Sequence, residues 1–164
     1  MTDREQLVVI HGSFNATDAL CVAASLTGDI KAKVESEIIY PYYCFDARCS
    51  VPILTGRQQV TLVCLVDAVN GLGATADSFE LKKESVLVEH VLATGVAELT
   101  AVDIAHRTVT HHLGSKLRTI AEFNVTMQPR GFIYKRFWVV RTSDARLLVD
   151  STTAGWHPLK LMAA

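Results

Sequence analysis

Residues 39–45 read Ile-Tyr-Pro-Tyr-Tyr-Cys-Phe, and residues 133–139 read Ile-Tyr-Lys-Arg-Phe-Trp-Val. Aromatic and β-branched side chains favour strands, so each stretch predicts a β-strand. A second strand that ends in Leu-Val-Asp follows each of them, at 65–67 and at 148–150, and a glycine comes shortly after both. The similarity predicts two related β-hairpins in one chain, with chance resemblance of two aromatic hairpins as the alternative.

A helix is predicted before each aromatic strand. Apolar residues recur at the 3.6-residue period over 19–26, and Gly28 is a natural stop. A second helix is predicted to open at Asp103 and to stop at Gly114. Its apolar side is formed by Ala101 or Val102, Ala105, Val109 and Leu113. The candidate N-terminal caps of the first helix are Asn15, Thr17 and Asp18.

After each predicted helix, the spacing at which apolar residues recur changes from 3.6 residues to two. Apolar and polar residues alternate over 30–34 and again over 117–127, which is typical of half-buried strands. A turn is predicted at 129–131, Pro-Arg-Gly. Because Pro41 cannot donate a hydrogen bond, the first aromatic strand is expected to bend or to lie at a sheet edge.

Together these patterns predict an α+β fold of two pseudo-repeated α-β-β-β halves, with an antiparallel sheet packed on helices. Each helix is expected to pack on the strands of its own half. A half of about 70 residues buries its sheet poorly alone, so two copies sharing a core are favoured. We therefore expect a single compact domain over 1–164, in which half-repeats 1–75 and 100–164 are joined by 76–99.

The end of the first hairpin, 65–71, reads Leu-Val-Asp-Ala-Val-Asn-Gly, and 148–155 is similar but less close. A helix followed by a hairpin that ends in Val-Asp-x-x-x-Gly resembles the PepSY-type module and, more loosely, cystatin-like α+β folds. The resemblance covers only these two hairpin regions. Members of the PepSY-type family are typically exported and are associated with restraining peptidases or with cell-surface regulation. The resemblance implies an architecture more than an activity.

The amino-acid composition limits the kinds of protein that this chain can be. Of the 164 residues, 49% are apolar and 20% are charged, which supports a hydrophobic core. Sixteen Lys and Arg against seventeen Asp and Glu leave a net charge of −1, so no bulk attraction to nucleic acid or to a membrane surface is expected. The longest uncharged stretch, 6–17, is shorter than the about 20 residues that cross a bilayer. No signal peptide is apparent at the start, so a cytoplasmic protein is expected.

Charge is nevertheless uneven along the chain. Residues 1–100 contain seven Lys and Arg and thirteen Asp and Glu, whereas 101–164 contain nine and four. Basic and aromatic residues interleave over 130–141, a pattern that can bind single-stranded nucleic acid by stacking and phosphate contacts. On an extended strand, however, neither face is a purely basic and aromatic platform, so nucleic acid is not favoured as a partner.

Neither the cysteines nor the histidines show a diagnostic spacing. The cysteines contain no Cys-x-x-Cys pair, so they are expected to be small buried hydrophobes in a reducing compartment; a metal or redox pair at Cys44 and Cys49 is the alternative. His111 and His112 point about 100° apart on a helix, and His106 does not have the four-residue spacing of a helical metal pair. The sequence implies no metal and no cofactor.

Asp67 and Asp150 close equivalent hairpins. A carboxylate that accepts a hydrogen bond from the backbone two residues on starts a turn, and that structural role is favoured. The alternative is a pair of carboxylates for acid–base work. A phosphate loop at Gly71-Leu72-Gly73 is not favoured, because the glycine pattern does not continue.

No assembled catalytic set is readable, which favours a non-catalytic binding or protein-interaction module for an unknown protein, a small molecule or a second copy. The predicted contact residues are the hairpin aromatics Tyr40, Tyr42, Tyr43, Phe45, Tyr134, Phe137 and Trp138. The alternative is a small enzyme with a pocket between sheet and helix, whose acid–base candidates are His106, His111, Asp67 and Asp150.

Overall fold

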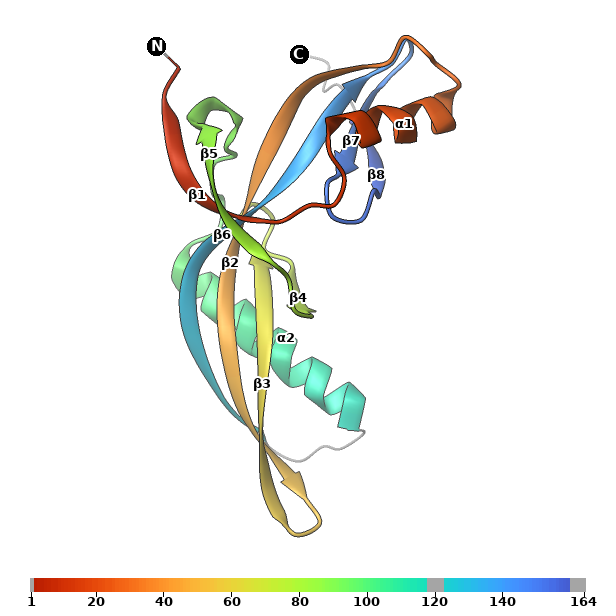
Figure 1. The fold of residues 1–164 in the computed structure, drawn as a ribbon. Helices are drawn as coiled ribbons and strands as arrows, with labels where there is room; N and C mark the ends of the chain where they lie inside the picture. Colours follow the sequence, from red (N-terminus) through yellow and green to blue (C-terminus); the bar gives the residue numbers. More distant parts are fainter. Residues whose placement is uncertain (1, 118–122, 160–164) are drawn as a thin grey trace. The chain divides into compact units, whose positions relative to one another are not determined.

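A computed structural model describes residues 2–117 and 123–159 (Figure 1). Within these residues the protein has an α+β fold, with two α-helices and a mixed sheet of eight strands. The elements in chain order are β1 (Arg4–Ile10), α1 (Ala16–Thr27), β2 (Lys33–Ile53), β3 (Gly56–Asp67), β4 (Gly73–Ala76), β5 (Leu81–Leu87), the short 3₁₀ helix η1 (Val88–His90), α2 (Glu98–Leu117), β6 (Asn124–Arg141), β7 (Arg146–Asp150) and β8 (Trp156–Leu159). Neither helix in this part of the chain is both long and apolar enough to span a membrane.

The contacts divide the described chain into two compact units. Unit 1 contains 2–40, 80–92 and 134–159, and unit 2 contains the remaining described residues. The long strands β2 and β6 belong to both units, because the chain passes from one unit to the other after Tyr40 and after Ile133. Each unit therefore combines segments from early and late parts of the sequence.

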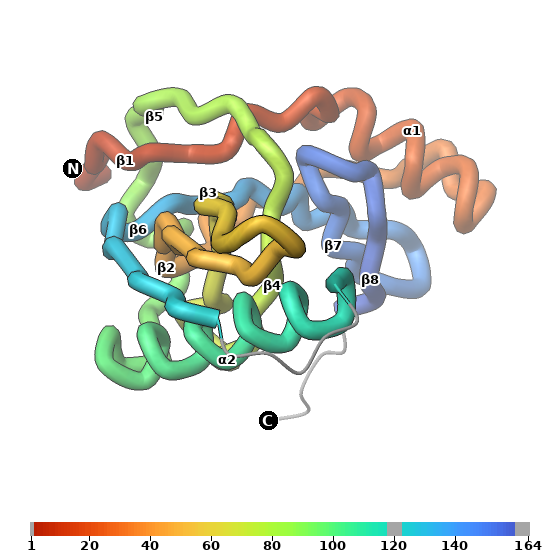
Figure 2. The backbone as a smooth tube through the Cα atoms, turned by 90° about the horizontal axis from the view of Figure 1, so that it is seen from below, coloured from red at the N-terminus to blue at the C-terminus, as the bar shows by residue number. Residues whose placement is uncertain are grey.

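Unit 2 is a sheet with α2 against one face (Figures 1 and 2). Strand β2 pairs with β3 in a hairpin whose register begins at Tyr42↔Asp67 and ends at Ile53↔Gly56. The helix buries residues spaced four apart, which are Ala101, Ala105, Val109 and Leu113. This is the apolar stripe predicted from the sequence, and it packs on Phe45, Cys64 and Val66 of the sheet.

The limits predicted for the second helix are wrong. The helix α2 begins at Glu98 rather than at Asp103, and it continues through Gly114 to Leu117. A glycine inside a helix costs only about 1 kcal/mol relative to alanine, so burial of the neighbouring Leu113 is enough to keep the helix intact there.

Unit 1 contains the strand pair that makes the sheet mixed. Strand β1 pairs with β5 in the antiparallel direction but contacts β6 in parallel, at Val9↔Tyr134. Strands β6, β7 and β8 pair antiparallel in turn. The fully antiparallel sheet predicted from the sequence is therefore wrong. Since no hairpin connects β1 to β6, nothing in the local chain fixes their relative direction.

Helix α1 shows the predicted termini but an unexpected packing partner. Asn15 caps it in a capping box with Asp18, and Gly28 ends it with a φ of 70°. Its buried residues are Ala19 and Ala23, and they pack on Val140, Leu147 and Val149. These valines and the leucine belong to β6 and β7, and Val34 of β2 packs against the same cluster, so α1 packs mainly on the hairpin of the other predicted half.

Strand β2 departs from the sequence prediction at its start and at Pro41. It begins at Lys33, and Ile30 before it is 94% exposed. Pro41 lies inside the strand, which has β3 on one side and β6 on the other, so of the two alternatives, a bend or an edge position, the edge position is wrong. Pro41 is tolerated because it precedes the first residue paired with β3, and its carbonyl accepts a hydrogen bond from Ala68 N at 3.1 Å.

Strand β6 joins into one strand two stretches that the sequence separates by a turn, 124–127 and 133–139. It runs without a break through 129–131, where a turn was expected, and Gly131 takes a φ of 85° within it. Only glycine adopts this backbone conformation readily. The predicted alternation over 117–127 fails at Leu117, which is helical, and its positions 118–122 lie outside the described residues.

Candidate functional site

The seven predicted aromatic residues are divided between the two units. Tyr43, Phe45 and Phe137 are buried, and the half-buried members are Tyr40, Tyr42, Tyr134 and Trp138. Several contact one another: the rings of Tyr40 and Phe137 lie 6.0 Å apart edge to face, and the ring of Tyr43 lies 4.6 Å from that of Phe132. Trp138 differs because it also lines a cavity in unit 1.

This cavity has a volume of about 210 Å³. Its wall is formed by the loop 11–15 between β1 and α1, by Glu84 of β5, by Arg136 and Trp138 of β6, and by Ser151 after β7. It thus combines charged, aromatic and hydroxyl groups from four separate segments of the chain. Polar groups that converge from separate segments on one hollow can fix the orientation of a bound small molecule.

Arg136 is the most strongly held side chain of the cavity. Its Nε donates to Glu37 at 2.7 Å and its Nη2 donates to Glu84 at 2.6 Å. The guanidinium also lies 5.5 Å from the centre of the Trp138 ring. His90 Nδ1 is 3.3 Å from the other oxygen of Glu37. These contacts hold the guanidinium plane in one orientation, as a rigid binding group requires.

Hydrogen bonds tie the loop before α1 to the two strands beneath it. The indole Nε1 of Trp138 donates to Phe14 O at 3.0 Å, and Phe14 N donates to Ser151 O at 3.0 Å. Ser151 N donates in turn to Arg136 O at 3.2 Å. The cavity wall is therefore fixed by backbone geometry and not only by side-chain packing.

Ser151 carries a polar group that the fold does not use. The residue is 2% exposed, and its hydroxyl has no hydrogen-bond partner among the described residues. Gly12 lies directly against it, since a Cβ on Gly12 would be 2.5 Å from Ser151 Oγ. An unsatisfied buried hydroxyl costs about 1–3 kcal/mol. Its presence in the wall of a polar cavity marks it as a candidate ligand contact.

Both turn aspartates have the structural role expected from the sequence. Asp67 Oδ1 accepts from Val69 N at 2.8 Å, and Asp150 Oδ1 accepts from Thr152 N at 2.8 Å. Asp150 additionally forms an ion pair with Lys135 at 2.6 Å. Burial alone would raise the pKa of Asp150, but hydrogen bonds from Lys135 and Thr152 outweigh it and lower that pKa.

We expect Asp150→Asn to lower the free energy of unfolding at pH 7 by about 1–2 kcal/mol, because it removes charge-assisted hydrogen bonds. Folding lowers the pKa of Asp150, so its carboxylate stabilises the wild-type protein fully above the pKa of the unfolded chain, about 3.9. This difference in stability between wild type and variant disappears as the pH falls through the pKa of Asp150 in the folded protein. Urea unfolding of both proteins at pH 7 and at acidic pH measures this. The exposed neighbour Asp144→Asn is the control, and an equal loss from that variant would contradict the prediction.

The cysteines largely follow the structural expectation. Cys44, Cys49 and Cys64 are buried free thiols, whereas Cys21 is exposed on α1. Burial raises the pKa of Cys64 to about 11 and also raises those of Cys44 and Cys49. A raised pKa keeps these sulfurs as thiols, which are poor nucleophiles and poor metal ligands.

The acid–base candidates are not gathered into a common site within either unit. His106 and His111 are exposed on α2 in unit 2, and Asp67 and Asp150 belong to different units. Among residues 2–117 and 123–159, no three His, Cys, Asp or Glu side chains are grouped to hold a metal ion.

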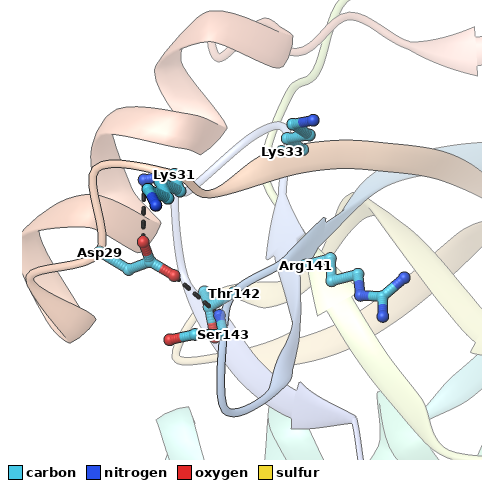
Figure 3. Close-up of a pocket in the computed structure, with 6 residues that line it drawn as sticks. All are labelled: Asp29, Lys31, Lys33, Arg141, Thr142 and Ser143. Carbon is cyan, nitrogen blue, oxygen red and sulfur yellow. Dashed lines mark hydrogen bonds between the residues drawn. The ribbon is translucent and has the colours of Figure 1, made fainter.

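Sequence reasoning missed His11, Gly12, Glu84, Arg136 and Ser151, which come from distant segments and share no motif. Of these, Arg136 alone gave a signal, because it is one of the basic residues that interleave with aromatic residues over 130–141. A second hollow of unit 1, near Asp29 and Arg141, is shown in Figure 3.

Comparison of the chain with protein-family models, with curated proteins and with solved structures finds no match.

Proposed function

We propose that this chain is a non-catalytic binding module built from two pseudo-equivalent halves, and that it holds a small polar ligand in the cavity beside Arg136 and Trp138. The observation that carries the proposal is the hydroxyl of Ser151, which is buried without a partner in the wall of that cavity. Charged and aromatic groups already fixed by other contacts surround the same hollow.

The order of elements supports two equivalent halves. A helix, a long strand, a second strand and a four-residue strand follow one another as α1, β2, β3 and β4, and again as α2, β6, β7 and β8. A further strand, β1 or β5, precedes each helix. Such an order is expected when one structural segment occurs twice in a chain.

Ring donors on the aromatic strands also correspond. Trp138 Nε1 donates to Phe14 O in unit 1, and Tyr43 Oη donates to Val96 O at 2.7 Å in unit 2. Phe14 lies two residues before α1, and Val96 lies two residues before α2. Each unit therefore uses one ring of its hairpin to hold the loop that enters its helix.

The backbone beneath these rings repeats as well. Ser151 N donates to Arg136 O at 3.2 Å in unit 1, and Ala68 N donates to Pro41 O at 3.1 Å in unit 2. Ser151 thus corresponds to Ala68, and Arg136 corresponds to Pro41. Because unit 2 makes the same backbone network with an alanine and a proline, neither the hydroxyl nor the guanidinium is needed to build it. Of the two, the hydroxyl of Ser151 has no partner among the described residues and is available for binding.

The strand registers support a match between the two halves that differs by one residue from the match by sequence. Tyr42 pairs with Asp67, and Phe137 pairs with Asp150. Since both aspartates start the same kind of turn, the proposed repeat matches Tyr42 with Phe137. Comparison of the two aromatic stretches by sequence alone matches Tyr42 with Arg136 and is one residue out of step.

Binding is favoured over the enzyme alternative by the way the acid–base candidates are used. The carboxylates of Asp67 and Asp150 accept hydrogen bonds from turn backbone, and Asp150 is also paired with Lys135. A general base needs a lone pair within reach of a substrate proton. Glu84 and Arg136 in the cavity pair with each other and therefore present fixed hydrogen-bonding groups.

We expect Ser151→Ala to raise the free energy of unfolding by about 1 kcal/mol, because it removes an unsatisfied buried hydroxyl without changing the backbone. Chemical denaturation measures the change, with the exposed Ser36→Ala as the matched control, for which we expect no change beyond about 0.5 kcal/mol. A loss of stability in Ser151→Ala would mean that the hydroxyl contributes to the fold, and the main support for the site would be gone.

The binding proposal is tested with a fragment library of neutral, anionic and cationic small molecules, monitored by ¹H–¹⁵N NMR. The chain has two tryptophans, so the indole N–H of Trp138 reports on the cavity while that of Trp156 on β8 is an internal control. We expect fragments that shift Trp138 together with the amides of Gly12 and Ser151, and weaker binding to Ser151→Ala and His11→Ala. A library in which no fragment shifts Trp138 more than Trp156 contradicts the proposal.

A further inference from the structure

The β2–β3 hairpin of unit 2 ends in two exposed apolar side chains. Pairing of the strands continues to Ile53↔Gly56, so only Leu54 and Thr55 form the turn. Leu54 is fully exposed and Ile53 is 46% exposed. Figure 1 shows this end of the hairpin projecting past the last turn of α2. We call Ile53 and Leu54 the apolar tip.

The apolar surface continues from the tip to the end of α2. A hollow of about 120 Å³ lies between the hairpin and the helix, and both Ile53 and Leu117 line it. Leu117 is itself 43% exposed. The other apolar residues of this hollow are Val51, Pro52, Val60, Leu62 and Leu113. The exposed apolar surface at this end of unit 2 is therefore larger than the two side chains of the tip.

The charged residues closest to the apolar tip along the chain are basic. Hairpin residues 47–66 contain Arg48 and Arg57 but no Asp or Glu. Helix residues 104–117 include Lys116 and likewise contain no Asp or Glu. All three basic side chains are exposed. This end of unit 2 thus combines an apolar projection with positive charge, although the net charge of the whole chain is −1.

The acidic residues of the same elements lie well behind the apolar tip. Asp46 precedes Ile53 by seven positions, which is about 23 Å of extended strand, and it pairs with Arg130 at 3.6 Å. On α2, Asp103 precedes Lys116 by thirteen positions, about 20 Å of helix. Both distances exceed the Debye length of about 8 Å at physiological ionic strength, so these carboxylates are screened from the tip.

The basic residues lie on both faces of the hairpin end. Alternate residues of β2 pack against α2, and Arg48 belongs to the other set, on the face away from the helix. Arg57 opposes Pro52 on that same face, and its Nε and Nη2 donate to Ser50 Oγ at 2.7 Å and to Ser50 O at 2.8 Å. Lys116 lies on the helix side, where it lines the hollow with Ile53.

We propose that the apolar tip inserts into the surface of a lipid bilayer that contains anionic lipids. Leu54 and Ile53 enter the boundary between headgroups and acyl chains, and Arg48, Arg57 and Lys116 remain among the lipid phosphates. A projecting tip with cations on both faces matches a flat, negatively charged surface that is approached end-on. The site uses none of the residues that line the Arg136 cavity, so it is independent of the function proposed above.

The first test is sedimentation of the protein with vesicles of phosphatidylcholine alone or of phosphatidylcholine mixed with phosphatidylserine. We expect the wild-type protein to bind the mixed vesicles more tightly, with an affinity that falls as salt is added. The variant Ile53→Gln/Leu54→Gln should bind at least about tenfold more weakly, because it removes the apolar groups that leave water. Leu54→Gln alone is a milder form of the same test, at a side chain that the fold does not bury.

The matched apolar control is Leu72→Gln/Leu99→Gln, which removes two exposed leucines elsewhere in unit 2 and should leave binding unchanged. Equal weakening in this control would overturn the site. So would a wild-type protein that binds neither kind of vesicle, or that binds both equally well. Self-association that Leu54→Gln abolishes, without vesicle binding, would assign the tip to a second copy of the chain and would also overturn the proposal.

The charge contribution is tested with Arg48→Gln/Lys116→Gln, for which we expect about tenfold weaker binding to the mixed vesicles. Its matched control is Lys82→Gln/Lys83→Gln, which removes the same charge from exposed positions of β5. An equal effect of the two variants would mean diffuse attraction and would contradict a site at the hairpin end.

Insertion itself is measured with Leu54→Trp in vesicles whose lipid acyl chains carry bromine, which quenches tryptophan fluorescence on contact. The wild-type protein, with Trp138 and Trp156, gives the background. We expect additional quenching in Leu54→Trp, because the new ring enters the acyl region. Binding without quenching beyond the background would show that the tip stays outside the bilayer, and the proposed insertion would be wrong.

Discussion

Replacing Phe45 by alanine should lower the free energy of unfolding by about 3–5 kcal/mol. Phe45 is 1% exposed and belongs to the core between the β2–β3 hairpin and α2. Its ring lies 6.4 Å from that of Tyr43 in a stacked arrangement, and the helix side of the core consists largely of alanine and valine. Small neighbours on a helix cannot move far enough to fill the space that a phenylalanine leaves, so most of the cavity would remain.

Denaturant unfolding of Phe45→Ala measures this loss, and the m-value shows whether the transition remains two-state. Leu54→Ala is the control, because Leu54 at the β2–β3 turn is fully exposed and its truncation should change stability by less than about 0.5 kcal/mol. A loss below about 1.5 kcal/mol in Phe45→Ala would be inconsistent with the described core.

Gly12→Ala should lower the free energy of unfolding by about 1–3 kcal/mol, the second largest loss that we expect after that of Phe45→Ala. A Cβ at this position would lie 2.5 Å from Ser151 Oγ and 2.6 Å from Ser151 O. The loop cannot simply move away, because Phe14 N is hydrogen-bonded to the same Ser151 carbonyl. The variant should also close or distort the Arg136 cavity, whose wall includes Gly12.

A double-mutant cycle with Ser151→Gly separates the contact of the new Cβ with the Ser151 side chain from its contact with the Ser151 carbonyl. Ser151→Gly removes the hydroxyl and its carbon but leaves the backbone carbonyl. We expect the double variant Gly12→Ala/Ser151→Gly to recover part of the loss, with a favourable coupling energy between the sites. The exposed neighbour Ser13→Ala controls for changes to the loop in general. Additive effects of Gly12→Ala and Ser151→Gly would show that the two residues are not in contact.

The parts of the fold that were predicted correctly depend on neighbours in the chain. Asn15 with Asp18 and the left-handed Gly28 set the ends of α1. The four-residue spacing of Ala101, Ala105 and Val109 identified the buried face of α2. Caps, turns and periodicity act over a few residues, so the local pattern is sufficient to place them.

The candidate sites were predicted much less well. Trp138 was among the predicted contact residues and does line a cavity, but its neighbours His11, Glu84 and Ser151 were not identified. Glu84 reaches Arg136 across 52 positions of the chain and Phe14 reaches Trp138 across 124. Proximity of this kind leaves no periodic signal, and a single hydroxyl such as that of Ser151 gains its significance only from being buried without a partner.

Patterns in the sequence are sufficient to predict the α+β class, the buried face of α2 and the two hairpins that end in turn-forming aspartates. Which helix covers which hairpin depends on contacts between distant parts of the chain. In β2, Tyr42, where pairing with β3 begins, lies nine positions after Lys33, and this is about 30 Å of extended strand. Because α1 directly precedes β2, it remains near the start of that strand and buries its alanines on β6 and β7 instead. An apolar helix face must be buried, but the hydrophobic effect does not specify which strands bury it. The length of β2 therefore decides which strands α1 covers.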